Sequence, residues 1–199
     1  QFDTIYHEHH YYYSLYSISK LMKRHSLEIF DVDKLAIHGG SYRIYVKKID
    51  SDRKITNRFK KLYSYEGMIG LNSKEFYKNF QTIVDQIKKS SLKLINSLKK
   101  RKKTIHAYGA AAKGNTFLNF CKVNNSQVNY TYDLNATKVG KYLPGSHIKI
   151  LANKEIIKQK PDYIIIMPWN IFKEIKSQLS YTKKWGCKLI RFLPKTEIS

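Results

Sequence analysis

The stretch "TIHAYGAAAKGNTFLNFCKV", residues 104–123, decides the fold. Its first six residues favour a strand, glycine and alanine form a short turn, and the apolar spacing from Asn115 onward is typical of a helix. Strand and helix signals then alternate to residue 193, which predicts a parallel sheet with right-handed crossovers. We expect strands at 104–109, 128–133, 147–151, 162–167 and 187–193, and helices at 115–123, 153–160 and 170–180.

The first part of the chain has a different order. Residues 2–6 have the pattern of a strand end, and Ser14 is suited to be the N-cap of a helix. Residues 28–37 and 42–49 alternate as two strands, joined by a turn at Gly39-Gly40. By analogy only, this order resembles the end of a class I methyltransferase sheet, where a strand and a helix are followed by an antiparallel pair of strands.

Residues 51–103 are expected to connect the two parts. Residues 51–72 are polar and irregular, and Ser73 begins a long amphipathic helix that runs to about Lys99. The run "LKKRKK" at its end would neutralise the negative end of the helix dipole. The expected domains are 1–50, a methyltransferase-like tail; 51–103, a linker and connecting helix; and 104–199, a Rossmann-like α/β domain.

The net charge of +22 raises the question of a nucleic-acid partner. Lysines are spread along the whole chain, which indicates a bias of composition, and we expect no nucleic-acid partner. No apolar run approaches 18 residues and the two cysteines form no disulfide framework, so we expect a cytoplasmic, monomeric protein without membrane contact. The chain opens on Gln1, which predicts a fragment of a longer protein.

The turn "AYGAAAKGNT", residues 107–116, resembles two phosphate-binding motifs and matches neither. In the dinucleotide motif G-x-G-x-x-G, Gly109 and Gly114 fit, but Ala111 replaces the middle glycine. Asp133, at the end of the next expected strand, has the place of a ribose-binding acid. A close-packed turn that needs small residues is the structural alternative.

In the P-loop motif, Asn115 stands where the lysine is required, and Lys113 comes too early. A helix N-terminus after a strand nevertheless binds phosphate through free N–H groups. We therefore predict that Lys113, Asn115 and Thr116 contact a phosphate group, with Lys141 and Arg43 as further anion contacts.

A second cluster, "DTIYHEHHYYYS" at residues 3–14, concentrates titratable side chains. Its adjacent histidines lack the H-x-x-x-H spacing with which a helix holds zinc, so we expect no metal here. A proton-transfer site and a purely structural cluster are the remaining interpretations.

Five stretches together resemble one family: "FDTIYHEHHYYYSL", "IHGGSYRIYV", "AYGAAAKGNTFLN", "DLNATKVGKYLPGSHI" and "PDYIIIMPWN". They are similar to the C-terminal half of the S-adenosyl-L-methionine (SAM)-dependent sugar C-methyltransferases, which methylate carbon 3 of nucleotide-linked deoxysugars. The resemblance implies a parent with a zinc-binding N-terminal region and a SAM-binding middle domain, both outside this chain. It also implies a TDP-sugar substrate, and no activity for this chain alone.

The implied reaction removes a proton from carbon 3, next to a 4-keto group, to give an enolate. His9 is the expected base because neutral imidazole accepts a proton near pH 7. Tyr6, on the same face as Glu8 if the strand continues, could donate to the ketone or enolate oxygen. Glu8 could act together with His9 or orient the sugar. The alternative is a non-catalytic module that binds a nucleotide or nucleic acid.

Overall fold

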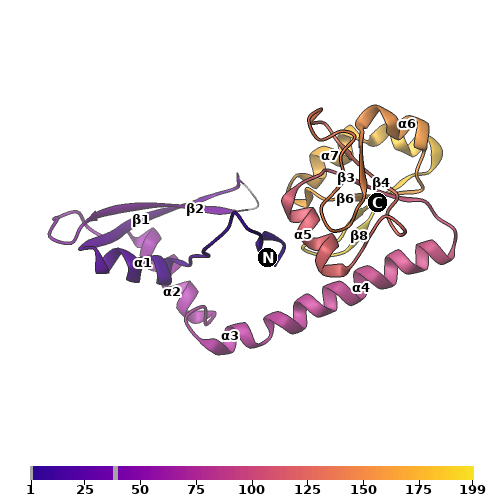
Figure 1. Ribbon diagram of the computed structural model, residues 1–199. Coiled ribbons are helices and arrows are strands. Elements are labelled where there is room, and N and C mark those ends of the chain that lie inside the picture. Colours follow the sequence, from indigo (N-terminus) through magenta and orange to yellow (C-terminus); the bar gives the residue numbers. More distant parts are fainter. Residues whose placement is uncertain (1, 38–39) are drawn as a thin grey trace. The chain divides into compact units, whose positions relative to one another are not determined.

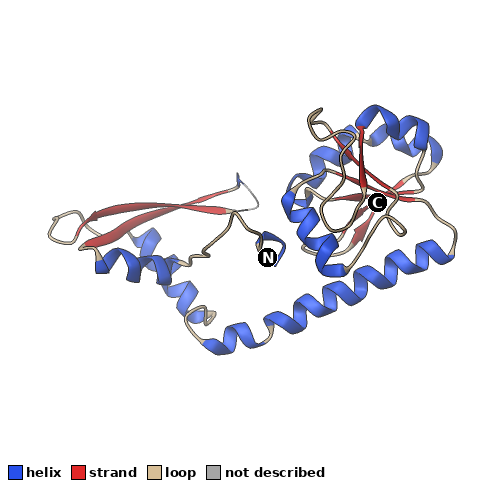
Figure 2. Cartoon of the chain, in the orientation of Figure 1, coloured by secondary structure: helices blue, strands red, loops and turns tan. Residues whose placement is uncertain are grey.

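The computed structural model describes residues 2–37 and 40–199, and the chain divides into two compact units (Figures 1 and 2). Residues 10–83 form the hairpin unit, and residues 1–9 join residues 84–199 in the six-stranded unit. The first nine residues therefore belong to a unit built mainly from the C-terminal part of the chain. The turn expected at Gly39-Gly40 lies partly outside the described residues.

The hairpin unit packs helices against a two-stranded antiparallel sheet. Its elements are α1 (Leu15–Arg24), β1 (Leu27–Leu35), β2 (Ser41–Lys48), α2 (Asn57–Met68) and α3 (Lys74–Lys78). The predicted N-cap is confirmed, because the Ser14 hydroxyl accepts a hydrogen bond from the N–H of Ser17, and the Ser17 hydroxyl accepts one in return from the N–H of Ser14. Its small core consists of Leu15, Val32 and Leu62, with Ile44, Phe59 and Tyr63 partly buried around it.

Two charged groups hold the hairpin unit together. The buried Glu66 carboxylate on α2 accepts hydrogen bonds from the N–H groups of Leu15 (3.0 Å) and Tyr16 (3.1 Å), which begin α1. A carboxylate at this position satisfies orphan donors and complements the helix dipole. Arg58 binds both Asp31 and Asp33 on β1, and this contact holds the pKa of Asp31 far below its usual range.

The structure corrects two predictions between the units. The stretch expected to be irregular, residues 51–72, contains α2, whose N-cap Thr56 accepts a hydrogen bond from the N–H of Phe59 (3.2 Å). The single helix expected over 73–99 is two helices, α3 and α4 (Phe80–Lys100), because α3 ends at Lys78 with Asn79 as its C-cap. The apolar pattern runs across this break without a change of phase, so periodicity alone could not reveal it.

The six-stranded unit alternates strands and helices as predicted. Its strands are β3 (Ile105–Tyr108), β4 (Tyr130–Asp133), β5 (Lys149–Ala152), β6 (Tyr163–Ile166), β7 (Lys188–Arg191) and β8 (Glu197–Ile198). They lie in the order β5-β4-β3-β6-β7-β8, all parallel except β8. The chain runs outward from β3 to β5 and returns to β6, so the strand order reverses between β3 and β6. This topology confirms a Rossmann-like fold.

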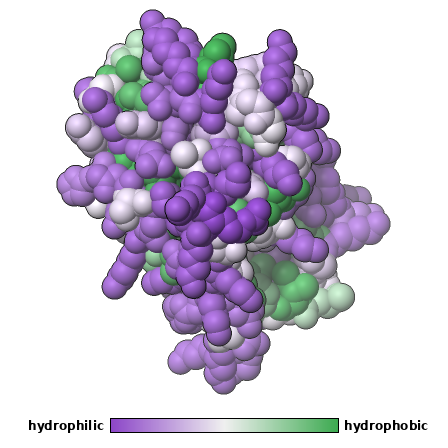
Figure 3. Space-filling model, turned by 90° about the vertical axis from the view of Figure 1, so that its right-hand side faces the viewer, coloured by the Kyte–Doolittle hydropathy of each residue, from purple (hydrophilic) through white to green (hydrophobic). Residues whose placement is uncertain are grey.

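Helices cover both faces of this sheet. Buried side chains of α4, of α5 (Ala112–Cys121) and of the short N-terminal 3-10 helix η1 (Phe2–Thr4) pack on one face. The other face packs against side chains of α6 (Ile156–Gln159), α7 (Phe172–Gln178) and the 3-10 helix η5 (Ser180–Trp185). Two further 3-10 helices, η3 (Asn153–Glu155) and η4 (Trp169–Ile171), precede α6 and α7. Hydrophilic side chains dominate the molecular face in Figure 3, with apolar ones in scattered patches.

The strand predicted at residues 2–6 is wrong. Residues 2–4 form η1, and the N–H of Ile5 then donates to the carbonyl of Phe2 (3.0 Å) in a turn. Phe2 is buried against the rings of Phe117 and Phe120 on α5 instead of in a sheet. Packing of one aromatic ring therefore overrides a weak local strand preference.

A histidine is buried in the six-stranded sheet. His106 on β3 is 3% exposed, and its Nδ1 lies 2.5 Å from the hydroxyl of Tyr132 on β4. Burial, with a smaller contribution from the charge of Lys99, lowers the pKa of His106 to about 4. The imidazole is therefore neutral in the folded protein at neutral pH.

This neutral histidine makes stability depend on pH. Its pKa is lower in the folded protein than the ordinary 6.5, so the unfolded chain binds the proton more tightly, and stability falls as pH drops from about 6.5 to about 4. The full loss from this group is about 3 kcal/mol. Thermal unfolding of His106→Gln should show a shallower decline over this pH range than the wild type. Parallel pH profiles would contradict this prediction.

Candidate active site

A buried hydrogen bond anchors the N-terminal segment to the six-stranded unit. The indole N–H of Trp169, just after β6, donates to Oδ2 of Asp3 (3.2 Å). Asp3 is 2% exposed, and a buried carboxylate without a partner would be costly. The segment that follows η1 is therefore held close to the carboxyl end of β6, the side on which open α/β sheets bind ligands.

Directly after this anchor, Tyr6 and His9 come together. Nδ1 of His9 lies 2.9 Å from the carbonyl oxygen of Thr4, and Nε2 lies 3.2 Å from the hydroxyl of Tyr6. A carbonyl can only accept, so Nδ1 carries a proton, and in the neutral imidazole the lone pair of Nε2 then faces the hydroxyl of Tyr6. The two rings lie with centroids 4.2 Å apart. The segment thus holds an imidazole in the tautomer that a general base requires.

The remaining members of the cluster lie at the surface. Glu8 and His7 are exposed, with 4.0 Å between Oε1 of Glu8 and Nε2 of His7. Because residues 5–9 turn instead of extending, the expectation that Tyr6 and Glu8 share one face of a strand is wrong. Of the three predicted catalytic residues, Tyr6 and His9 are in contact, and His9 and Glu8 are both exposed.

The glycines after β3 are required by close packing. Gly109 has φ +93°, and a Cβ there would lie 2.6 Å from Cγ of Pro168. A Cβ on Gly114 would lie 2.7 Å from Cβ of Met167. Two loops therefore meet where the strand order reverses, as the structural alternative for this turn predicted.

Asp133 at the end of β4 closes the same loop. Its Oδ2 accepts a hydrogen bond from the N–H of Ala110 (2.7 Å), and its Oδ1 accepts one from the N–H of Asn135 (2.8 Å). The ammonium of Lys138 donates to the carbonyl of Ala110 (2.9 Å). Both carboxylate oxygens are engaged within the protein, so Asp133 stabilises the loop instead of presenting a free acid to a ribose.

The first turn of α5 gathers three predicted binding residues. Its N-cap, Ala111, supplies no side-chain hydrogen bond, and Lys113 is half-buried in this turn. The buried Oδ1 of Asn115 has no hydrogen-bond partner in the described chain, whereas the hydroxyl of Thr116 donates to the carbonyl of Ala112 (3.1 Å). Backbone N–H groups, one cation and one unsatisfied amide oxygen thus lie together.

The other two predicted anion contacts lie elsewhere. Lys141 is exposed, and its carbonyl accepts from the N–H of Ile150, which places it beside β5 at the sheet edge. Arg43 is exposed on β2 in the hairpin unit. The structure therefore does not gather Lys141 with the first turn of α5, which follows β3, two strands further in.

Sequence reasoning missed the anchor itself. Asp3 and Trp169 are separated by 166 positions, and nothing in either local pattern pairs them. It also missed the carbonyl of Thr4, which selects the tautomer of His9. Every residue has a backbone carbonyl, so the residue type cannot show which carbonyl accepts a hydrogen bond from a side chain.

The cofactors implied by the resemblance do not fit the residues described. The loop after β3 lies under Pro168 with the N–H of Ala110 bound to Asp133, which leaves no open cradle there for SAM. Nowhere in residues 2–37 and 40–199 do three or more His, Cys, Asp or Glu side chains converge as a zinc ion would require.

Comparison with known proteins shows the family of the chain. A family profile described as the C-methyltransferase C-terminal domain matches residues 36–194. The chain belongs to this family of C-methyltransferases.

One relative is the C-methyltransferase NovU of Streptomyces niveus, which is 30% identical over 175 residues. The matched region covers 88% of this chain and 42% of NovU, so the chain spans less than half the length of this curated relative. In the described part of the chain, no helix is both long and apolar enough to cross a lipid bilayer.

The anchor can be tested directly. Trp169→Phe keeps the ring but removes the donor to Asp3, which should cost about 1–3 kcal/mol of stability. Hydrogen–deuterium exchange of residues 2–9 should accelerate as this segment loosens. Trp185→Phe is the matched control, because its indole donates to Pro161 (3.2 Å) on the other face of the sheet. Equal effects of both variants on residues 2–9 would refute the anchor.

Proposed function

We propose that the chain is the C-terminal part of an enzyme that methylates carbon 3 of a nucleotide-linked 4-keto-deoxysugar. The observation that carries this proposal is the fixed tautomer of His9, held by Thr4 and Tyr6 on an anchored segment. SAM, bound by a part of the enzyme outside these residues, would supply the methyl group. Family membership supports the reaction class. The sugar is what the resemblance to the sugar C-methyltransferases implies.

His9 removes the proton from carbon 3. The neighbouring 4-keto group acidifies this C–H bond, since the electron pair that remains becomes an enolate. Nε2 of His9 accepts the proton, and Nδ1–H keeps its bond to the carbonyl of Thr4, which stabilises the imidazolium formed. The hydroxyl of Tyr6, displaced from Nε2, donates to the ketone oxygen as negative charge develops there.

Glu8 orients the substrate from its exposed position. Its carboxylate accepts hydrogen bonds from sugar hydroxyls, an interaction that suits an acceptor-only side chain at a surface.

The first turn of α5 binds the nucleotide. Lys113 and the free N–H groups of this turn contact the diphosphate. Oδ1 of Asn115 can only accept, so it pairs with a hydroxyl or an N–H of the nucleoside rather than with a phosphate oxygen. Thr116 accepts through its lone pairs while its proton is bound to Ala112. Lys141 and the net charge of +22 attract the dianion at longer range.

A ligand-binding measurement distinguishes the proposed methyltransferase from a module that binds nucleic acid. Thymidine diphosphate should raise the melting temperature of the chain, because a ligand that binds only the folded state stabilises it. Asn115→Asp places a negative charge in the nucleotide site and should abolish the shift, with Asn125→Asp as a control in a surface turn. Stabilisation by nucleic acid alone, with a steep salt dependence, would replace the methyltransferase proposal by a nucleic-acid-binding module.

The role of His9 is testable in the full-length protein. His9→Asn should lower methyl transfer by about 10²–10⁴-fold and leave the affinity for the sugar nucleotide nearly unchanged. Exchange of the carbon 3 proton with D₂O, followed without methyl donor, should fall by the same factor. His7→Asn removes an exposed neighbouring imidazole and should retain both activities. Wild-type exchange in His9→Asn would exclude His9 as the base.

A further inference from the structure

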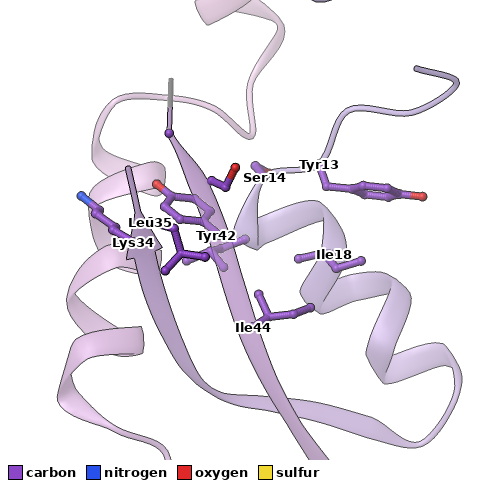
Figure 4. Close-up of a pocket in the computed structure, with 10 residues that line it drawn as sticks. Tyr13, Ser14, Ile18, Lys34, Leu35, Tyr42 and Ile44 are labelled. Carbon is purple, nitrogen blue, oxygen red and sulfur yellow. The ribbon is translucent and has the colours of Figure 1, made fainter. Parts of the chain in front are cut away.

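Residues 5–9, the catalytic segment, are held mainly from their N-terminal side. After this segment, residues 10–13 have no regular secondary structure, and the side chains of Tyr11 and Tyr13 are 76% and 55% exposed. Figure 4 shows Tyr13 and Tyr42 directed to opposite sides of an apolar groove of about 820 Å³ between α1 and β2. Because exposed side chains restrain a backbone little, the position of the catalytic segment depends on the residues that precede it.

Phe2 joins the catalytic segment to α5. Its ring is 7% exposed, and its centroid lies 5.1 Å from that of Phe120 and 6.3 Å from that of Phe117. Phe117 is fully buried, stacks on Phe192 (5.2 Å) and meets the indole of Trp169 edge-on (5.8 Å). Because these five rings are close-packed in one unit, a shift of α5 is transmitted to Phe2.

The first turn of α5 is the part of this helix that a ligand can fix. Ala111 at the N-cap forms no side-chain hydrogen bond, and the buried Oδ1 of Asn115 has no partner in the described chain. Further along, the protein itself holds the helix, since the amide of Asn119 donates to the carbonyl of Pro144 (3.0 Å). An uncapped turn is less stable than a capped one, so a ligand that binds its N–H groups restricts its motion.

A second route leads from the same turn to the catalytic segment. A Cβ on Gly114 would lie 2.7 Å from Cβ of Met167, so α5 is in close contact with the residues that follow β6. Two positions after Met167, the indole of Trp169 donates to Asp3. Both routes lie inside the six-stranded unit and end at η1.

We propose that a nucleotide bound at the first turn of α5 fixes the catalytic segment through Phe2, which is thereby a positioning residue for His9. This inference rests on the proposed function, which assigns the diphosphate to that turn. Binding energy from the part of the substrate that does not react is used in this way to orient the groups that do react. The nucleotide therefore raises the rate of the chemical step as well as the affinity.

Amide hydrogen–deuterium exchange of the full-length protein tests the coupling. Saturating thymidine diphosphate should slow the exchange of residues 5–9 by about fivefold or more in the wild type. In Phe2→Leu, which removes the ring and keeps an apolar side chain, this protection should be lost, while thymidine diphosphate still raises the melting temperature. Phe172→Leu is the matched control, because it removes a similarly buried ring (4% exposed) on the other face of the sheet and should keep the protection.

Kinetics separate positioning from a merely structural role. Phe2→Leu should lower kcat for the nucleotide-linked sugar by about tenfold and leave KM nearly unchanged, because His9 is misplaced while the nucleotide still binds. With the free 4-keto-sugar, which leaves the turn of α5 empty, Phe2→Leu and the wild type should react at the same slow rate. An equal loss with both substrates would indicate a structural defect and overturn the positioning role.

The outcomes for the nucleotide site and for the coupling are distinct. A rise in melting temperature without slower exchange of residues 5–9 in the wild type would overturn the coupling and leave the nucleotide site in place. Full protection in Phe2→Leu would exclude Phe2 as the route. Absence of any rise in melting temperature would overturn the nucleotide site and the coupling together.

Discussion

The arrangement of the candidate active site depends on one buried hydrogen bond, from the indole of Trp169 to the carboxylate of Asp3. Trp169 is placed by the sheet, since it follows β6 where the strand order reverses. Asp3 is held beside Trp169 because a buried carboxylate requires a hydrogen-bond donor, which the indole N–H supplies. Between them they bring a segment from the start of the chain to the edge of the sheet where ligands bind. On this segment, the carbonyl of Thr4 and the hydroxyl of Tyr6 contact the two ring nitrogens of His9.

The glycine loop of the six-stranded unit is closely packed. In a dinucleotide-binding protein the loop after the first strand approaches the pyrophosphate. Here Pro168 packs over Gly109, and Asp133 accepts a hydrogen bond from the N–H of Ala110. Groups of the protein itself therefore occupy the space around the loop. What remains open is the first turn of α5. The fold is therefore retained, while its usual cofactor site has become a structural junction.

The sheets of the hairpin unit and of the six-stranded unit differ in how their faces and edges are covered. One sheet is buried by helices on both faces and has covered or very short edges. The other has two strands, a small core and an eight-residue edge beside an apolar groove. This contrast follows from the number of strands in each sheet and from the helices that cover them.

The sequence alone determined the alternation of strands and helices from residue 104, the helix after Ser14 and the antiparallel pair, because each has a strong local period or cap. It also predicted Tyr6, Glu8 and His9 as catalytic residues, of which Tyr6 and His9 are in contact. Only the tertiary structure decided that residues 2–4 form a 3-10 helix, that Tyr6 meets His9, and that Asp133 closes the glycine loop. These features depend on partners distant in the chain, such as Phe117 and Trp169, and local residue patterns carry no information about such contacts.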